Sequence, residues 1–306
     1  MLEITFSFEL CTFNLNPLVT TSWLAEHLND ENVRIIDTRW YLLQPTKGAS
    51  DYHNAHIPNA LYLSVDQHLA ARPLSDAKTG RHPLPDADTF AETMMRAGIS
   101  NSTHVVVYDD AGGANAARLW WLLRYFSSED PLAQENVSLL DGGLSQWVAE
   151  GRPLSGETPI FPRGTFHARA NPHMVVTKAE MIALTRNAHA LILDARAPER
   201  YRGETEPIDA RAGHIPGAKN APVAGNLCSA QDARFLNAAE LQARYDALGA
   251  NGADEIVAYC GSGVNAAADL FALHLAGYHN TRLYAGSFSE WSRDADLPIV
   301  TGSAPY

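Results

Sequence analysis

The sequence predicts an α/β fold built from two copies of one domain, each a mainly parallel β-sheet flanked by helices. Two observations predict it. Short segments recur in the same order in both halves of the 306-residue chain, and in each half short apolar runs alternate with helical patterns. Because this alternation is typical of parallel sheets, we expect ligands beyond the carboxyl ends of the strands.

The repeat is visible in four pairs of segments. They are 35–39 (IIDTR) with 192–196 (ILDAR), 56–60 (HIPNA) with 214–218 (HIPGA), 105–108 (VVVY) with 256–259 (IVAY), and 139–143 (LLDGG) with 283–287 (LYAGS). A tryptophan follows each member of the last pair. The spacing between copies shortens along the chain, so the halves differ mainly by loop insertions. We therefore expect domains at 18–155 and 174–306, joined by a linker at 156–173.

The composition argues against several classes of protein. The net charge of −12 speaks against non-specific nucleic-acid binding, and no apolar run approaches the length of a membrane span. The acidic N-terminus does not have the pattern of a signal peptide, and residues 1–16 are expected to be a loosely held extension. Three cysteines without a C-x-x-C pair favour a reducing, cytoplasmic setting and no structural zinc.

Each half has a continuous apolar run, at 105–108 and 256–259, that predicts a strand buried on both faces. A turn of small residues and an expected helix, at 116–126 or 265–276, follow each run. In the second half Cys260 comes directly after the strand, and in the first half Asp109 has the corresponding position. Cys260 is therefore expected where such folds bind ligands.

The segment 260–266 reads Cys-Gly-Ser-Gly-Val-Asn-Ala. Gly261 and Gly263 permit unusual backbone angles, so that successive N–H groups can form an anion-binding nest at the start of a helix. A thiol held there should be partly thiolate and therefore nucleophilic. The alternative, a small buried apolar residue, is the expectation for Cys11 and Cys228, because neither precedes such a loop.

Other chemistries fit the loop less well. The G-x-G-x-x-A pattern of 261–266 lies late in its domain and lacks a suitable acid further on, which argues against dinucleotide binding. A Walker motif is absent, and a cysteine phosphatase would need arginine where Ala266 stands. His53 and His56 are spaced like metal ligands, but the repeat of the His-Ile-Pro element in both halves favours a structural turn.

These elements, taken in order, resemble the tandem-domain rhodanese family of sulfurtransferases over nearly all of residues 18–306. The resemblance implies two rhodanese-like domains, with the active site at their interface on the loop of the second domain. It also implies that the first domain is non-catalytic, because Asp109 stands at the cysteine position. The role expected for Asp109 itself is a structural cap.

The cysteine loop is similar to that of the 3-mercaptopyruvate type, whereas the thiosulfate type more often has basic residues after its cysteine. This resemblance implies that Ser262, His82 and Asp66 act beside Cys260, the last two contributed by the first domain. Trp40 matches an aromatic residue beside the family's site. A serine bonded to an Asp-oriented histidine can carry a proton to the pyruvate enolate that C–S cleavage leaves.

The carboxylate of the donor needs a cationic partner, and arginine offers a bidentate one. By the same resemblance, Arg200 matches the family's first substrate arginine. Ile208 stands in the region of the second, so Arg211 is the candidate replacement, with an exposed loop charge as the alternative. Arg196 is expected to tie Asp194 to nearby loops. The substrate-binding residues expected from the loop are Gly261, Gly263, Val264, Asn265 and Ala266.

The sequence thus predicts transfer of sulfur from 3-mercaptopyruvate, through a Cys260 persulfide, to a thioredoxin-like or small thiol or to cyanide. Two alternatives stay open: thiosulfate as donor, and a non-catalytic rhodanese-like module for binding or carrying sulfur. The expected partners are small molecules and a thiol acceptor, without nucleic acid, membrane, metal or cofactor. A monomer is expected, because the two joined copies already share one interface.

Overall fold

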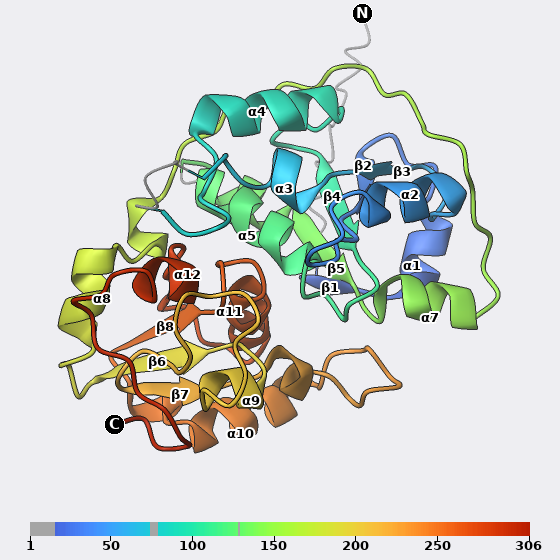
Figure 1. Ribbon diagram of the computed structural model, residues 1–306. Coiled ribbons are helices and arrows are strands. Elements are labelled where there is room, and N and C mark those ends of the chain that lie inside the picture. The colour runs from blue at the N-terminus through green and yellow to red at the C-terminus, as the bar shows by residue number, and fades with distance from the viewer. Residues whose placement is uncertain (1–15, 74–78, 128) are drawn as a thin grey trace, which may run out of the picture.

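The computed structural model describes residues 16–73, 79–127 and 129–306, so Cys11 lies outside the described residues. Two parallel sheets with surrounding helices form its two halves (Figure 1). Every strand pair within both sheets is parallel, as the sequence predicts.

The first sheet has the order β1-β5-β4-β2-β3. Its strands are β1 (Leu18–Val19), β2 (Val33–Asp37), β3 (Ala60–Tyr62), β4 (His104–Tyr108) and β5 (Val137–Leu140). Its helices are α1 (Thr21–Glu26), α2 (Lys47–Asn54), α3 (Val65–His68), α4 (Ala87–Arg96), α5 (Ala116–Phe126), α6 (Pro131–Glu135) and α7 (Gly143–Ala149). β4 is buried along its whole length, which explains its continuous apolar sequence.

The second sheet has the order β7-β6-β8-β9. Its strands are β6 (Ala190–Asp194), β7 (Ala218–Asn220), β8 (Glu255–Tyr259) and β9 (Thr281–Leu283). Its α-helices are α8 (Lys178–Leu184), α9 (Pro198–Tyr201), α10 (Ala238–Ala247), α11 (Ala266–Leu275) and α12 (Ser287–Trp291), with short 3₁₀ turns at Pro172–Met174, Val223–Asn226 and Ala250–Gly252. The order β3-β2-β4-β5 of the first domain recurs as β7-β6-β8-β9, so the sequence repeat is a structural repeat.

The repeated motifs hold equivalent turns together. Arg196 donates from Nη2 to Asp194 and to the carbonyl of Gly213, as expected, and Arg39 pairs with Asp37 in the first copy. In the His-Ile-Pro element both ring nitrogens of His56 contact backbone carbonyls. This bonding supports the structural reading of that histidine.

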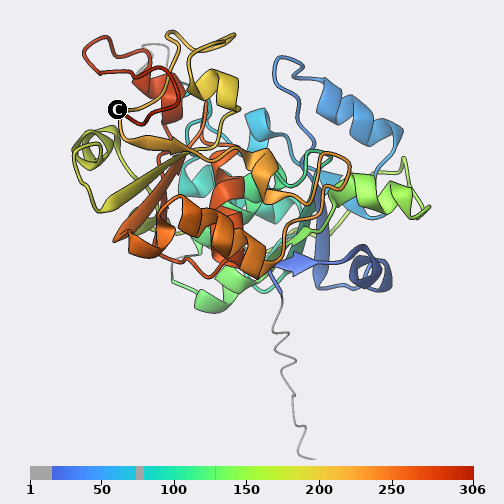
Figure 2. The same ribbon diagram turned by 90° about the horizontal axis from the view of Figure 1, so that it is seen from below.

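Helices α5 and α11 join the two halves and lie side by side at the centre of the molecule (Figure 1 and Figure 2). Trp120 of α5 meets Phe271 of α11 edge to face, with ring centroids 5.0 Å apart. One apolar core continues through this contact into both domains. Packing of this kind fixes the first domain against the cysteine loop of the second.

The connection between the domains follows the outside of the first domain past α4 before it reaches α8 (Figure 1). Arg163 in this segment forms an ion pair with Glu92 of α4, and the carbonyl of Glu157 contacts the His56 ring. The expected linker is therefore attached to the first domain along its course.

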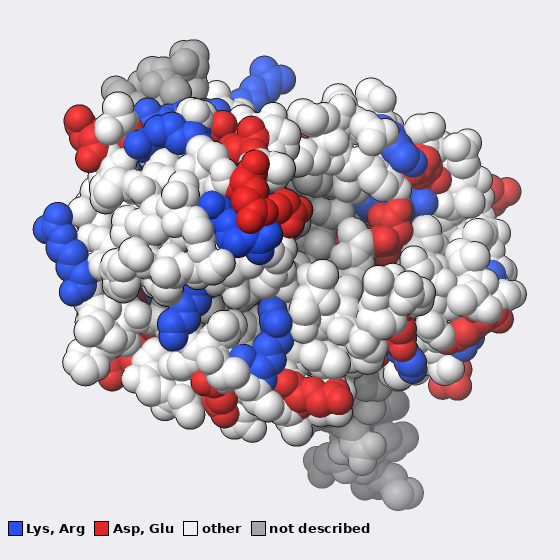
Figure 3. Space-filling model, turned by 60° about the horizontal axis from the view of Figure 1, so that its bottom comes forward, with Lys and Arg blue, Asp and Glu red and all other residues white. Residues whose placement is uncertain are grey.

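Charged side chains are mixed on the surface. On the face in Figure 3, basic residues stand singly or in small groups among acidic ones. Among the described residues, no helix has the length and apolar character needed to cross a membrane.

Candidate active site

Cys260 lies at the carboxyl end of β8 and is only 4% exposed. Its sulfur accepts hydrogen bonds from the backbone N–H groups of Gly263, at 3.1 Å, and Ser262, at 3.5 Å. Gly263 has φ 79°, and a Cβ there would lie 2.7 Å from the carbonyl oxygen of Ala285. Glycine is therefore required for the turn that aims these N–H groups at the sulfur.

The rest of the cysteine loop builds the walls of this turn. Val264 and Ala266 are buried in the core, and Asn265 is exposed just before α11 begins. Backbone N–H groups of α12 donate to the carbonyls of Cys260 and Gly261 at 3.0 and 2.9 Å. The backbone of the loop is thus held by hydrogen bonds from α12 as well as by its own turn.

Ser262 and two side chains of the first domain form a hydrogen-bonded chain beside the sulfur. Ser262 Oγ lies 2.7 Å from His82 Nδ1, and His82 Nε2 lies 3.0 Å from Asp66 Oδ1. The carboxylate accepts the Nε2 proton, which leaves Nδ1 to accept from the serine hydroxyl. The hydrogen bond with His82 lowers the pKa of Asp66, so the carboxylate is ionised at neutral pH.

Trp40 fixes the orientation of this chain. Its indole N–H donates to Asp66 Oδ2 at 2.8 Å, and its ring meets the His82 ring edge to face at 5.3 Å. The structure thus brings together, across the domain interface, four residues that the sequence singled out: Ser262, His82, Asp66 and Trp40.

Arg200 also lies at the loop, and a second arginine, Arg81, joins it from the first domain. Arg200 Nη2 donates to Asp209 at 2.9 Å, and Arg81 Nη1 pairs with the other oxygen of the same carboxylate. A Cβ at Gly261 would lie 2.7 Å from Arg81 Nη2 and 3.6 Å from Arg200 Nη1. The glycine therefore lets the Arg81 guanidinium approach the loop backbone closely, with that of Arg200 at ordinary contact distance.

Sequence reasoning missed Arg81, although it directly precedes the singled-out His82. The expected replacement, Arg211, has a different place. Its guanidinium donates to four backbone carbonyls, those of Trp291, Ser292, Asp294 and Leu297. These bonds anchor the chain after α12 and use the donors of Arg211. The geometry therefore favours Arg81 over Arg211 as the partner of Arg200.

Arg118 of α5 is a second residue that sequence reasoning missed. It is fully buried and donates to the carbonyls of Leu69, His82 and Gly263, which joins His82 to the cysteine loop. Burial lowers the pKa of Arg118 to about 10, so the group is still cationic at neutral pH. The available signal was one arginine within the otherwise apolar stretch 116–123 of α5.

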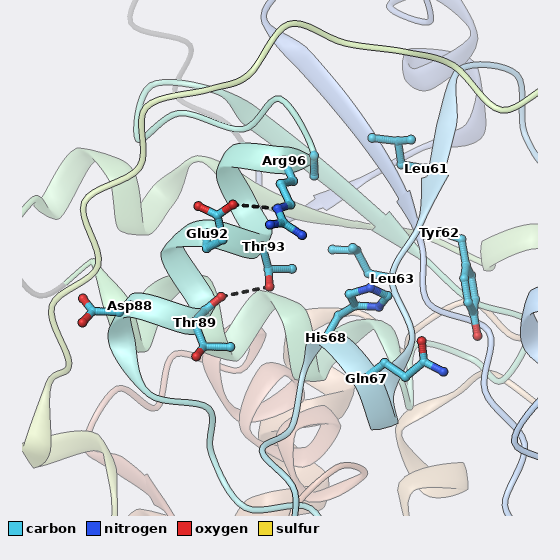
Figure 4. A pocket seen from close by; sticks show the side chains of 11 residues that line it. Leu61, Tyr62, Leu63, Gln67, His68, Asp88, Thr89, Glu92, Thr93 and Arg96 are labelled. Carbon is cyan, nitrogen blue, oxygen red and sulfur yellow. Dashed lines mark hydrogen bonds and ion pairs between the residues drawn. The ribbon is translucent and has the colours of Figure 1, made fainter.

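An open groove elsewhere on the first domain lies between β3, α3 and α4 (Figure 4). Two of its charged groups pair with each other, since Arg96 donates to Glu92 at 2.6 Å. Neither Asp66 nor His82 lines this groove. Among the described residues, no group of three or more His, Cys, Asp or Glu side chains is arranged to hold a metal ion.

The fold and the cysteine loop point to one class of protein. Residues 20–150 and 177–294 each match the rhodanese-like domain. The chain therefore belongs to the rhodanese-like family and contains two such domains in tandem.

Relatives that span almost the whole chain narrow the comparison. The chain is 44% identical over 287 residues, 93% of this chain and 98% of the relative, to a Pseudomonas aeruginosa protein named "Probable 3-mercaptopyruvate sulfurtransferase". It is 33% identical to an Arabidopsis thaliana "Thiosulfate/3-mercaptopyruvate sulfurtransferase 1, mitochondrial", over 92% of this chain and 78% of that one.

A solved structure with the same architecture is SseA from Escherichia coli, described as a 3-mercaptopyruvate sulfotransferase with the rhodanese fold. The two chains superpose with a TM-score of 0.76 at 33% identity, over 90% of this chain and 100% of the other. The predicted membership of the tandem-domain rhodanese sulfurtransferases is confirmed by these matches.

Proposed function

We propose that this protein is a sulfurtransferase that takes sulfur from 3-mercaptopyruvate and carries it on Cys260 as a persulfide. The observation that carries the proposal is the Asp66–His82–Ser262 chain, which ends at a residue whose own N–H belongs to the nest around the Cys260 sulfur. A proton relay is needed when the leaving group is a carbanion equivalent, and a simple persulfide carrier would not need one.

The sulfur-transfer step follows from this arrangement. The Cys260 thiolate attacks the donor sulfur, so that an S–S bond forms while the C–S bond breaks and its electron pair passes to the pyruvate enolate. The Ser262 hydroxyl, bonded to His82, supplies a route for the proton that converts the enolate to pyruvate. The N–H groups of Ser262 and Gly263 would then stabilise the persulfide anion.

Arg81 and Arg200 are the proposed partners of the donor carboxylate. Both lie over Gly261, next to the nucleophile, and each has N–H groups directed at the loop. Two guanidinium groups, one from each domain, supply a cationic pair for the donor carboxylate. Arg81 thus takes the part of the family's second arginine, in whose region this sequence has Ile208.

A comparison of two donors tests the proposal. Steady-state rates with 3-mercaptopyruvate and with thiosulfate are measured with one acceptor, and kcat/KM is expected to favour 3-mercaptopyruvate by at least about tenfold. A preference for thiosulfate would contradict the assignment of the donor and leave the Cys260 chemistry in place.

Thiosulfate is the second candidate donor. Ile208 at the position of the family's second arginine favours it, and the Arabidopsis relative is named for both donors. For the acceptor we propose a thiol, either thioredoxin-like or small, or cyanide, because each can attack the outer sulfur of a persulfide. A cytoplasmic monomer is proposed as the working form, on the grounds of the unpaired cysteines and the joined domains.

A further inference from the structure

The carboxylate of Asp209 bridges the two domains between Arg81 and Arg200. Its Oδ1 pairs with Arg81 Nη1 and its Oδ2 accepts from Arg200 Nη2. The Asp209 side chain is 1% exposed, and both arginines are less than one fifth exposed. Because this carboxylate is buried between two cations, solvent screens its charge less than it screens a surface ion pair, and its charge acts on the site.

Asp209 also determines where the remaining N–H groups point. Arg81 uses Nη1 for the carboxylate, while its Nη2 lies over Gly261 and its Nε is buried without a hydrogen-bond partner among the described residues. Arg200 uses Nη2 for both Asp209 and Glu206 and Nε for Glu206, and its Nη1 is the atom nearer to Gly261. The unused edges of both guanidinium groups therefore face the cysteine loop.

The charges of this cluster cancel. Arg81, Arg200 and Arg196, which also pairs with Glu206, contribute three positive charges, and three carboxylates, Asp209, Glu206 and Asp194, contribute three negative ones. A repulsive carboxylate weakens the binding of a dianion about twice as strongly, in free energy, as that of a monoanion at the same place. Mercaptopyruvate brings one carboxylate charge to this site, whereas thiosulfate is a dianion.

We propose that Asp209 is a positioning residue that aims Arg81 and Arg200 at the cysteine loop and makes the site prefer monoanionic carboxylates to dianionic sulfur oxyanions. This inference rests on the proposed function, because it assigns a charge requirement to the donor site. The proposal concerns the relative equilibrium affinities of the site for monoanions and dianions, which can be measured without turnover.

The test is calorimetric titration of wild type and Asp209→Asn with pyruvate, the monoanionic product, and with sulfate, a dianion without a transferable sulfur. Asp30→Asn, which removes the same charge from a half-exposed position in the first domain, is the control for overall charge. All titrations use one ionic strength, because screening changes both affinities.

In Asp209→Asn we expect the ratio of sulfate affinity to pyruvate affinity to rise about tenfold, with the ratio unchanged in Asp30→Asn. The KM ratio of thiosulfate to 3-mercaptopyruvate should fall in the same variant. A purely structural role for Asp209 would weaken both anions alike, and a ratio within about twofold of wild type would overturn the proposal. If circular dichroism shows Asp209→Asn to be unfolded, Asp209→Ser is used and read in the same way.

The result of this titration can be interpreted whether or not the proposed function is correct. If wild type transferred sulfur only from thiosulfate, the donor assignment would fail, while the anion ratio would still decide the role of Asp209.

Discussion

Asp109 and Cys260 occupy equivalent positions at the ends of the equivalent strands β4 and β8, and each accepts backbone N–H groups of the loop that follows. Asp109 accepts four of them, from Ala111, Gly113, Asn115 and Ala116, at 2.7–2.9 Å. The nest of the first domain is thus filled by the side-chain carboxyl group of Asp109 itself. The same type of loop in the second domain surrounds the Cys260 sulfur.

Replacement of Asp109 should therefore affect folding more than chemistry. Asp109→Asn turns an amide NH₂ toward loop N–H groups, which should cost about 2–4 kcal/mol of unfolding free energy in a fully buried place. The neighbouring Asp110→Asn is the control, with an expected loss below about 1 kcal/mol. Urea denaturation measures both. An unstable variant that also lost sulfur transfer per folded molecule would speak against a purely structural first-domain loop.

The proton relay makes a donor-specific prediction. Ser262→Ala and His82→Ala should each lower kcat for 3-mercaptopyruvate by about 100-fold, because general acid–base catalysis contributes on that scale. Thiosulfate turnover should fall far less, since sulfite leaves without needing a proton at carbon. The double variant should be no slower than either single one, because the two groups act as a unit. Equal losses with both donors would remove the relay from the mechanism.

Arg118 should matter for both stability and reactivity. Arg118→Met leaves the buried carbonyls of Leu69, His82 and Gly263 without a donor, at an expected cost of about 3 kcal/mol. It also removes a positive charge that stabilises the Cys260 anion, so alkylation by iodoacetamide should slow about tenfold.

The matched control for Arg118→Met lies on the same helix. Arg124→Met removes a guanidinium that donates to Gln134 and Glu135 and lies over the Trp120 ring, with no hydrogen bond to the cysteine loop among the described residues. This variant should keep the alkylation rate of wild type. If both variants slowed alkylation alike, the effect would come from the helix and not from the charge of Arg118.

A buried acid on α11 predicts a pH dependence of stability. Burial raises the pKa of Asp269 from its ordinary 3.8 to about 7. Between these values the folded protein retains a proton that the unfolded chain releases, so unfolding free energy falls as pH rises, by up to about 1.4 kcal/mol per unit. Above about pH 7 this contribution is lost in full.

Asp269→Asn removes this titration and keeps an oxygen that can accept from Asn226 and Tyr245. Between pH 5 and pH 8, wild type should therefore lose about 2 kcal/mol more stability than the variant in urea denaturation. Parallel losses in the two proteins would mean that Asp269 titrates near its ordinary pKa.

Much of this fold could be predicted from the sequence because its signals are local. Buried strands such as 105–108 are continuous apolar runs. A cysteine such as Cys260, placed between such a strand and a glycine-containing turn, indicates a nucleophile. His82, Ser262 and Asp66 were predicted only through resemblance to a family. No local sequence pattern predicts that residues of different domains will lie in contact.

The cation site shows why the remainder could not be predicted. Whether Arg81 or Arg211 reaches the loop depends on the packing of the two domains and on the free carbonyls after α12, neither of which is a local property. The role of Asp209 likewise could not be predicted from the sequence, because the two arginines that flank it come from different domains.

The central claim is that sulfur from 3-mercaptopyruvate becomes bound to Cys260. The most direct measurement is mass spectrometry of the intact protein, followed by its peptides, after incubation with 3-mercaptopyruvate without an acceptor, with Cys228→Ser and Cys260→Ser in parallel. We predict the added mass of one sulfur atom on the peptide containing Cys260 in wild type and Cys228→Ser, and its loss when cyanide is added. Sulfur on another residue, or undiminished turnover by Cys260→Ser, would contradict the account.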